Sequence, residues 1–451
     1  MSDQKRMCRR RWTAQAQLAL SWMLVGSASA AVSNPNFGSS PIPVGAGARA
    51  LGMGGAFSAV ADDATAATWN PAGMSQLERI ELGASVGWYH RRVHQNDGAG
   101  DDESDSEVDL DHASAIVPFH AFGCQQTVGL AWQRQFDFGR SVSASAHTDD
   151  GMVIVDQLTE VEVDGALATW SLSYALEIRP GFSLGVTVQT WGDALTGRSH
   201  YSRDVRETNT IEFFPFPASV ATLDDQQESK VEEGYSAVLG LWWQALPELT
   251  VAVVVKPTYR LRLATDSRSV VTTDGTPDPA ETDHFTSDFH YPTSATLGLA
   301  WRHGDRDTIA CDATWTQWSR YRVSEDGRTS SPVNSFIPYG DFDDGISLRL
   351  GYEHLLLLDE MVAALRIGAL YEELPGAAPA PAADQPDNTH AVIDRYYGVT
   401  IGASLCFDHI LYDLGAQVRQ GREVGTGQDT APDSTADITT VTVRLGIAYQ
   451  F

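Results

Sequence analysis

Apolar and polar residues alternate along most of the chain beyond residue 80. The final segment places one set on one face, namely Val441, Val443, Leu445, Ile447, Tyr449 and Phe451. Small or polar residues fill the other face, namely Thr440, Thr442, Arg444, Gly446, Ala448 and Gln450. The same alternation recurs in FSLGVTVQ (182–189), GISLRLGYE (345–353) and YGVTIGASLCF (397–407). A period of two with one apolar face predicts β-strands that are greasy on one side.

Alternation alone fits both a soluble sandwich and a membrane barrel, and three further features favour the barrel. The strands are about 9–11 residues long, which suits a tilted membrane crossing. Their second face is rich in Gly, Ser and Thr with an occasional Arg, as a wet or narrow lumen requires. Aromatic residues gather near strand ends, as in the interfacial girdles of barrels: Trp88, Tyr89, Trp191, Trp242, Trp243, Trp301, Trp315, Trp318, Tyr396, Tyr397, Tyr449 and Phe451.

The connections alternate between short and long. Tight turns occur at 179–181, 246–248, 358–360 and 408–409, and long polar loops are predicted at 91–112, 138–162, 193–233, 264–289, 376–393 and 420–438. Fourteen strands are predicted to start near residues 81, 113, 127, 163, 182, 234, 248, 290, 306, 345, 361, 394, 409 and 439. We therefore expect an all-β fold, a 14-stranded antiparallel transmembrane barrel.

Composition changes this picture little. The chain of 451 residues has 31 Lys and Arg against 59 Asp and Glu, a formal net charge of −28, which disfavours nucleic-acid binding. A mean hydropathy of −0.20 would suit a soluble acidic protein. Mean hydropathy does not identify a membrane barrel, however, because the polar residues of the lumen and of the loops offset the apolar residues that face the lipid.

The N-terminus indicates export. Residues 1–30 combine a basic start, an apolar stretch at 18–25 and the cleavage-like Ala28-Ser29-Ala30, which together predict a secretory signal peptide. We expect residues 31–80 to form a separate unit, because they do not alternate, and residues 81–451 to form the barrel. Cys124, Cys311 and Cys406 would remain after cleavage, and their number and wide spacing predict no disulfide framework.

The unit before the barrel carries a family resemblance. Its core reads PIPVGAGARALGMGGAFSAVADDATAATWNPAGMSQL (41–77), and this stretch resembles the N-terminal hatch of the FadL-like outer-membrane family. That family includes FadL, TodX and PorV-type proteins. The segments HYPTSATLGLAWR (290–302) and DATWTQWSRY (312–321) resemble family strands. Phe451, at the end of an alternating strand, looks like the C-terminal signal of bacterial outer-membrane barrels.

The resemblance implies a barrel in the bacterial outer membrane with its lumen plugged by the hatch at residues 31–80. Hydrophobic ligand would enter from outside, bind in an apolar pocket and leave sideways through the wall. The implied gating residues are the hatch glycines and the turn that follows, namely Gly54, Gly55, Trp69, Asn70, Pro71, Ala72 and Gly73. The implied partners are the ligand, outer-membrane lipid and lipopolysaccharide, and the barrel assembly machinery. A monomer is expected.

Candidate catalytic and metal sites are weak. The loop at 97–111 is rich in acids but lacks the EF-hand order, so a solvated external loop is favoured over a calcium site. His90 and His94 fall at a strand end, where helical ligand geometry is not expected. No GxSxG or HExxH occurs, and Asp312 is expected to be a lumen carboxylate. We therefore predict no enzyme activity, no cofactor and no metal.

Three arginines are candidates for ligand binding, because Arg349, Arg366 and Arg444 fall on predicted lumen faces. One of them could hold a ligand carboxylate through a bidentate pair. The alternative, favoured for most of them, is an ion pair with Glu353, Asp413 or a hatch acid, since buried charges must be paired.

The sequence thus predicts passive transport of hydrophobic small molecules, of the long-chain fatty acid or hydrocarbon type, by displacement of the hatch. The main alternative is a PorV-like role in protein secretion or surface attachment. An outer-membrane enzyme is a third and weaker reading, because no nucleophile arrangement is recognisable.

Overall fold

The computed structural model describes residues 42–95, 103–149, 151–192, 199–213, 217–325, 327–333, 343–376, 393–424 and 435–451. The predicted signal peptide and residues 31–41 of the predicted hatch lie outside this range, as do residues 97–102 of the acidic loop. Within the described residues, no helix is long and apolar enough to cross a membrane.

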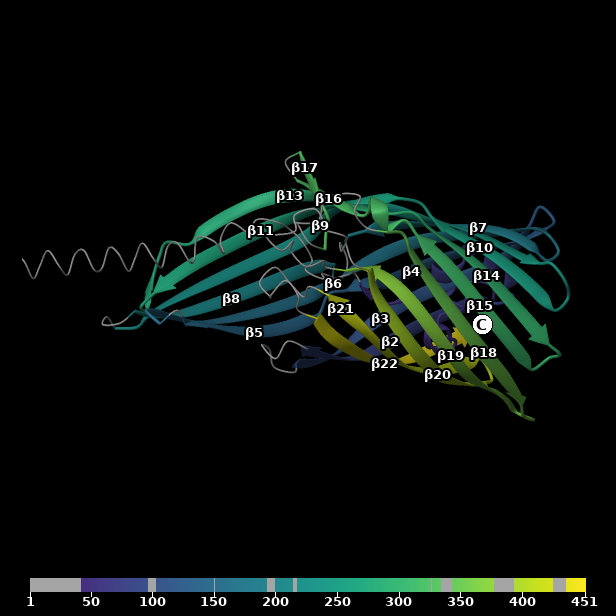
Figure 1. The fold of residues 1–451 in the computed structure, drawn as a ribbon. Helices are drawn as coiled ribbons and strands as arrows, with labels where there is room; N and C mark the ends of the chain where they lie inside the picture. The colour runs from purple at the N-terminus through teal and green to yellow at the C-terminus, as the bar shows by residue number, and fades with distance from the viewer. Residues whose placement is uncertain are drawn as a thin grey trace, which may run out of the picture.

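Among the described residues, fourteen antiparallel strands close into a barrel (Figure 1). In ring order they are β2 (Glu81–Gln95), β3 (Glu103–Ala121), β4 (Cys124–Asp137), β6 (Val153–Arg179), β7 (Phe182–Trp191), β9 (Ser219–Gln244), β10 (Leu249–Lys256), β14 (Ser294–His303), β15 (Asp307–Thr316), β18 (Gly345–Leu357), β19 (Met361–Pro375), β20 (Ile393–Phe407), β21 (Ile410–Val424) and β22 (Thr435–Gln450). The last strand pairs with the first, Glu81 opposite Gln450, so no edge is left in the ring. The predicted fold class is confirmed.

The alternation seen in the sequence separates the lipid face from the lumen. Leu365 and Ile367 on β19 and Val399 and Ile401 on β20 are exposed on the outside, whereas Arg366 between the first pair is buried. Exposed aromatic residues lie toward the ends of the outward apolar band, including Trp88, Trp243, Trp301, Trp315, Tyr397 and Tyr449. This pattern is the one a bilayer requires.

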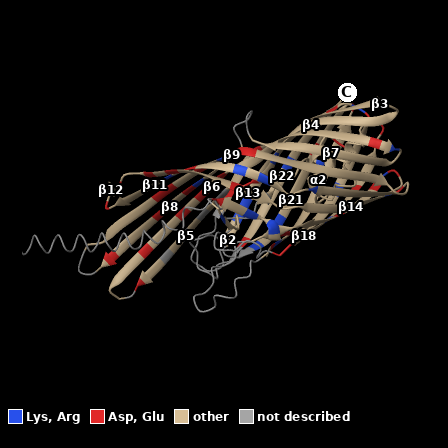
Figure 2. Cartoon of the chain, turned by 90° about the horizontal axis from the view of Figure 1, so that it is seen from above, with Lys and Arg blue, Asp and Glu red and all other residues tan. Residues whose placement is uncertain are grey.

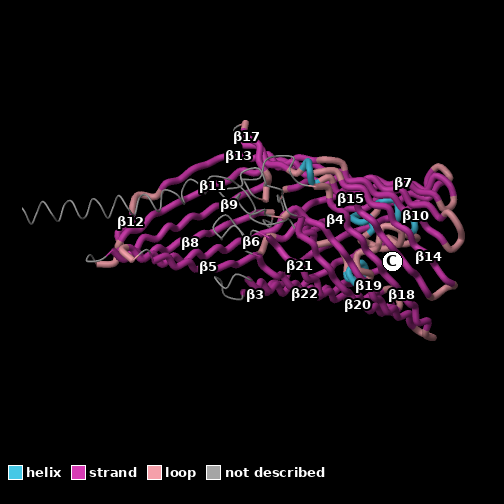
Figure 3. Tube along the Cα trace, viewed as in Figure 1, coloured by secondary structure: helices cyan, strands magenta, loops and turns pink. Residues whose placement is uncertain are grey.

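Several predicted loops are wrong, because strands occupy much of 138–162, 193–233 and 264–289. These strands form an extension, a sheet that continues the wall beyond the barrel (Figures 1 and 3). It consists of the first halves of β6 and β9 together with β5 (Arg140–Asp149), β8 (His200–Phe213), β11 (Tyr259–Thr273), β12 (Thr276–Pro277), β13 (Glu281–Tyr291), β16 (Arg322–Glu325) and β17 (Arg328–Ser330). For this reason β6 and β9 start well before their predicted positions. β3 also starts early, at Glu103, because it occupies the second half of the predicted loop at 91–112.

The strands of the extension were predicted as loops because both faces of this sheet carry polar residues. On β8 and β9 the outward row includes Asp204, Arg206 and Asp224, while the inward row includes Glu207 and Asp225. Figure 2 shows acidic and basic residues scattered along these strands. A hydrophobic period of two therefore cannot appear, although strand pairing is satisfied between the backbones.

The segment from residue 42 to residue 80 packs inside the barrel and is called the hatch below. It contains β1 (Ile42–Pro43), the helices α2 (Ala48–Gly52) and α3 (Ala66–Trp69), and the 3₁₀ helix η1 (Pro71–Gln76); a second 3₁₀ helix, η2 (Trp318–Arg320), lies after β15. Small buried side chains such as Ala50, Ala56 and Ala67 let the hatch backbone approach the wall. At one close approach Gly54, at φ 66°, meets Gly368 of β19, and a Cβ on Gly368 would lie 2.4 Å from the Gly54 nitrogen.

Wall side chains around the ring satisfy hatch backbone groups that are not bonded within the hatch. Hydroxyl or indole groups donate to hatch carbonyls in four pairs: Ser114 to Ala64 (2.9 Å), Thr187 to Ala67 (2.8 Å), Trp242 to Ala59 (3.1 Å) and Thr400 to Gly52 (3.0 Å). Asp312 accepts from the backbone nitrogens of Phe57 and Ser58 at 3.1 and 3.0 Å. The hatch is thus bonded to strands on several sides of the lumen, which disfavours its movement as one rigid body.

A buried ion pair adds to this attachment. Arg49 of α2 donates from Nε to Glu353 of β18 at 3.1 Å, and Arg366 of β19 donates to the same carboxylate at 2.6 Å. Arg366 also binds Ser404. Glu353 and Arg366 are both buried, so each charge depends on the other for stability.

Replacing Glu353 with Gln should therefore destabilise the folded barrel by roughly 3 kcal/mol, because Arg366 and Arg49 lose the carboxylate that they share. Arg366 then keeps only the longer pair with Asp413, and Arg49 keeps Asp62. The measurement is the heat-unfolding midpoint of the purified barrel on gel electrophoresis. Asp224→Asn is the matched control, since Asp224 pairs with Arg206 at 2.7 Å on the exposed extension; it should change stability by less than about 1 kcal/mol. Equal midpoints for the two variants would contradict this role of Glu353.

Candidate functional site

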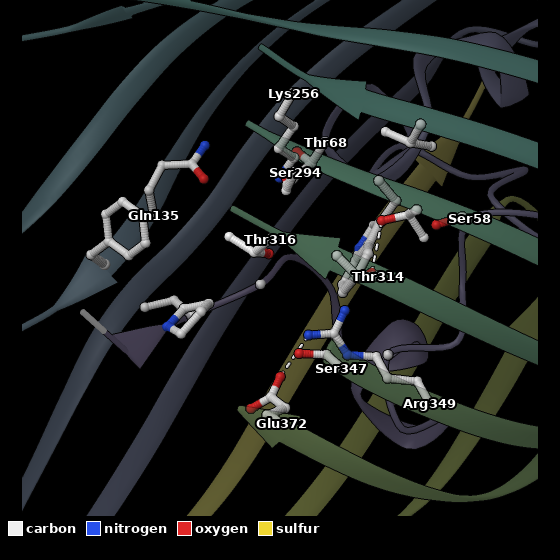
Figure 4. Close-up of a pocket in the computed structure, with 18 of the residues that line it drawn as sticks. Ser58, Thr68, Gln135, Lys256, Ser294, Thr314, Thr316, Ser347, Arg349 and Glu372 are labelled. Atoms are coloured by element: carbon white, nitrogen blue, oxygen red, sulfur yellow. Dashed lines mark hydrogen bonds and ion pairs between the residues drawn. The ribbon is translucent and has the colours of Figure 1, made fainter. Parts of the chain in front are cut away.

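A cavity of about 270 Å³ lies in the lumen between the hatch and the aromatic residues described next (Figure 4). Its hatch side is formed by Val44, Gly45, Gly55, Ser58 and Trp69. The remaining walls come from barrel strands far apart in the sequence, because lumen-facing residues of every strand converge on the axis.

One wall of the cavity is aromatic. Tyr259 and Tyr291 stack with ring centroids 4.9 Å apart, Trp191 stacks on Tyr259 at 5.2 Å, and Phe136 stacks on Tyr291 at 5.4 Å. Trp318 also lines this side. These rings belong to a buried apolar cluster that continues into the base of the extension through Tyr201, Leu261, Leu263 and Phe289. The wall offers apolar contact area to a hydrophobic molecule.

A second part of the lining is polar. Hydroxyl groups of neighbouring strands line it, namely Ser294, Thr296, Thr314, Thr316 and Ser347, together with the charged residues Lys256, Arg349 and Glu372 (Figure 4). Thr296 and Thr314 hydrogen-bond each other at 2.8 Å. The cavity is therefore amphipathic, which is the character expected of a site with a few placed polar groups in an apolar pocket.

Lys256 differs from the other cations that line the cavity. Arg349 donates to Glu372 at 2.6 Å, Arg419 approaches the other oxygen of Glu372 at 3.5 Å, and Arg444 donates to Asp111 at 2.7 Å. Within the described part of the chain, the Lys256 ammonium has neither an ion-pair partner nor a side-chain hydrogen bond. It is thus the group best placed to receive an anionic ligand.

The structure pairs all three arginines that the sequence offered as ligand contacts. Arg366 lies on the periplasmic side of the hatch with Glu353, and Arg444 is enclosed between wall and hatch. Arg349 reaches the cavity, but its guanidinium is paired with Glu372. Sequence reasoning missed Lys256, although a signal existed: Ala252, Val254 and Lys256 are in phase, and the first two are buried on the lumen side.

The predicted gating residues have structural roles in the hatch. Asn70 is fully buried, and its Nδ2 donates to the carbonyls of Ser58 at 2.9 Å and Leu241 of β9 at 3.1 Å. Its Oδ1 accepts from the nitrogen of Ala72 at 3.1 Å, which caps η1. Gly73 lies against Ala61, where a Cβ would come within 2.0 Å of the carbonyl oxygen. Among them, Trp69, Gly54 and Gly55 reach the cavity.

The barrel wall changes at the extracellular end of β3 and β4. Their backbone ladder runs from the Ala121–Cys124 pair to the His112–Gln133 pair and ends there. Beyond that point, β1 of the hatch pairs with β4, Ile42 opposite Asp137 and Pro43 opposite Phe136. We call the interval between residues 103–111 of β3 and 134–137 of β4 the wall gap. The register of β2 and β3 sets Trp88, a residue of the outer girdle, opposite Val108, so the gap lies at the level of the outer membrane surface.

A smaller pocket, about 50 Å³, adjoins the wall gap. Tyr89, Arg91, Asp105, Glu107 and Asp137 line it. The pocket shares further lining residues with the main cavity, namely Pro43, Val44, Leu51, Gln417 and Arg419. The first described residues of the hatch therefore form the partition between the cavity and the gap.

A family model decides what kind of protein this is. The model described as "Outer membrane protein transport protein (OMPP1/FadL/TodX)" matches residues 44–408, which is most of the chain. The chain belongs to this family. Family membership places the barrel in the outer membrane, and it makes the protein a channel for hydrophobic compounds rather than an enzyme.

Solved structures of the OMPP1/FadL/TodX family share the fold. A Pseudomonas aeruginosa FadL homologue is 17% identical with a TM-score of 0.63, covering 92% of this chain and all (100%) of that chain. The P. putida toluene transporter TodX is 15% identical with a TM-score of 0.56, covering 90% and 99% of the two chains. The monoaromatic hydrocarbon channel CymD is 13% identical with a TM-score of 0.53, covering 90% and 98%. No curated protein sequence matches this chain.

The remaining sequence candidates add no chemistry to this channel. Within the described residues, no group of three or more His, Cys, Asp or Glu side chains is arranged to hold a metal ion. Cys124, Cys311 and Cys406 are free. The first part of the acidic loop lies outside the described residues, and its later part, residues 103–111, belongs to β3.

Asn70→Ala should destabilise the barrel by about 1–3 kcal/mol, because it leaves the Ser58 and Leu241 carbonyls and the Ala72 nitrogen without their partner. Thermal unfolding followed by circular dichroism gives the measurement. Gln226→Ala, on the exposed face of the extension, serves as the control and should stay within about 0.5 kcal/mol of the parent. An Asn70 variant as stable as this control would remove Asn70 from the set of hatch anchors.

Proposed function

We propose that this channel carries amphipathic hydrophobic molecules, namely apolar chains that end in a carboxylate, from outside the cell into the outer leaflet. The observation that carries the proposal is the unpaired ammonium of Lys256 in a cavity whose other wall is aromatic. The solved relatives include a toluene transporter and a monoaromatic hydrocarbon channel. A site for a neutral hydrocarbon would leave the half-buried ammonium of Lys256 without a counter-charge among the described residues, which disfavours such a ligand.

The two walls favour the two ends of such a molecule. An apolar tail gains by leaving water for contact with Tyr259, Tyr291 and Trp191, at about 25 cal/mol per Å² buried. A carboxylate head gains a charge-assisted hydrogen bond from Lys256, with the hydroxyls of Ser294 and Thr316 lining the same cavity.

The route that we infer leads sideways through the wall gap. The hatch is hydrogen-bonded to several strands, so passage straight to the periplasm would require many bonds to break together. The gap needs only the partition at Pro43 and Val44 to move. At the membrane surface a polar gap suits a head group, while the tail can enter the bilayer core. The family resemblance implied that the hatch is displaced during transport. We infer that only its first residues, at Pro43 and Val44, move.

The transport role is tested by uptake of a labelled long-chain fatty acid in a strain that lacks this protein. We expect slower uptake, restored by the wild-type chain. Uncharged hydrocarbons of equal length should be affected less. Normal uptake of every hydrophobic acid tested would overturn the proposal. A PorV-like role, which rests on the hatch sequence, would instead be supported by copurification of a surface-bound secreted protein.

Lys256→Met should weaken binding of a long-chain fatty acid by roughly tenfold to a hundredfold, the loss of one charge-assisted hydrogen bond worth about 1.5–3 kcal/mol. Binding of the corresponding methyl ester should hardly change, because the ester carries no charge. The measurement is equilibrium titration of the purified protein. Lys230→Met is the control variant, since Lys230 pairs with Glu228 at 2.8 Å on the exposed extension. An unchanged preference for acid over ester in the Lys256 variant would rule out the assigned head-group site.

A further inference from the structure

The wall gap has side-chain ion pairs where the backbone ladder has ended. We propose that these pairs, centred on Arg134, are a lock that keeps the gap closed, so that release through the wall is controlled in the wall itself; this inference rests on the proposed function. Arg134 lies on β4 just beyond the last ladder pair, and it faces carboxylates of β3 across the gap.

Alternate residues of β3 supply the acids. Glu107, Asp109 and Asp111 point to the same side of the strand because side chains of a strand alternate. Arg134 lies 2.8 Å from Glu107, 2.8 Å from Asp109 and 3.3 Å from Asp111. Its own strand adds Asp137 at 3.7 Å. One guanidinium therefore joins β4 to three successive inward positions of β3.

A second arginine ties this cluster to the hatch. Arg444 of β22 donates to Asp111 at 2.7 Å and to the Val44 carbonyl at 2.9 Å. Tyr89 of β2 donates to the same Asp111 oxygen at 2.6 Å and lies under the Arg134 guanidinium, 4.6 Å from ring centre to carbon. Asp111, Arg444 and Arg134 are all buried, which makes these contacts stronger than surface pairs.

The composition of the lock indicates how it opens. Because several carboxylates of β3 share one guanidinium, Arg134 can lose its contact with Asp109 or Glu107 while Asp111 remains bound. The gap can thus widen at its outer end without leaving Arg134 as an isolated buried charge, which would cost several kcal/mol. Opening is accordingly stepwise from the outer rim inward, and the Asp111–Arg444 pair, which also holds the partition at Val44, is the last to break.

The test replaces one contact of the lock by a reversible covalent bridge. Asp109 and Arg134 are both changed to Cys in a chain whose native cysteines are changed to Ala. A short bis-methanethiosulfonate reagent links them through two disulfides, each formed by attack of a cysteine thiolate with release of methanesulfinate. The readouts are equilibrium binding of a fluorescent long-chain fatty acid, and its rate of transfer from the reconstituted protein into vesicles of phosphatidylethanolamine and phosphatidylglycerol.

Binding should be the same with and without the bridge, because the cavity is not altered. Transfer should be fast in the reduced protein, on the order of tenfold faster than in the parent, which corresponds to about 1.4 kcal/mol of lost closure. It should stop in the bridged protein and return on reduction. Equal transfer rates in the bridged and reduced forms, with binding intact, would overturn the lock. Absence of binding in every form, the parent included, would instead overturn the proposed function.

A single substitution gives an independent check. Arg134→Met should speed transfer, Arg134→Lys should restore much of the closure, and Arg206→Met, which removes an exposed arginine of the extension, should leave transfer at the parental rate. If Arg134→Met fails to fold, the bridged and reduced double-cysteine forms remain comparable, since they are the same folded protein before and after linkage. Transfer at the parental rate in a folded Arg134→Met barrel would contradict the proposal.

Discussion

The hatch and the wall satisfy each other's buried polar groups, and the rest of the structure depends on this exchange. An empty lumen would leave Glu353, Asp312 and Arg444 without hatch groups to bind, and an isolated hatch would leave its carbonyls without the wall hydroxyls. In a low-dielectric interior each such loss is expensive. Plug and barrel are therefore one folding unit, and the cavity is the space left above it.

This constraint also limits how the channel can work. A plug bonded around the ring cannot leave as a body, so the movable parts are those with the fewest bonds to the wall. The first residues of the described hatch are held at one place on the wall, by β1 pairing, by the bond from the Val44 nitrogen to the Gln135 carbonyl and by Arg444. The same region borders both the cavity and the wall gap. Most of the hatch is thus bonded around the ring and blocks leakage to the periplasm. The small partition is held at a single place on the wall, where a ligand can displace it.

The sequence predicted the fold better than the site, for physical reasons. Strands that face lipid can be recognised from the alternation of apolar and polar residues, as in β19 and β20. The starts of most barrel strands were predicted to within a few residues. The extension has polar residues on both faces, so β8 and β13 read as loops. Lumen residues are harder still, because their partners lie on distant strands: nothing local shows that Arg349 meets Glu372 whereas Lys256 meets no carboxylate. The hatch turn was found, but the sequence pattern did not show that Asn70 is an anchor.

The extension makes the rim of the barrel uneven, and this gives the molecule a front and a back. The 14 residues of β8 and their neighbours on β6, β9 and β11 continue one side of the wall outward, at about 3.3 Å per residue. The described parts of β18 to β22 do not reach as far (Figure 1). Among the described residues, a molecule that diffuses toward the barrel therefore meets a higher wall on the side of the extension. The mouth of the barrel is therefore asymmetric. In a crowded membrane, the orientation of each molecule about its own axis would set the side from which a ligand reaches it most easily.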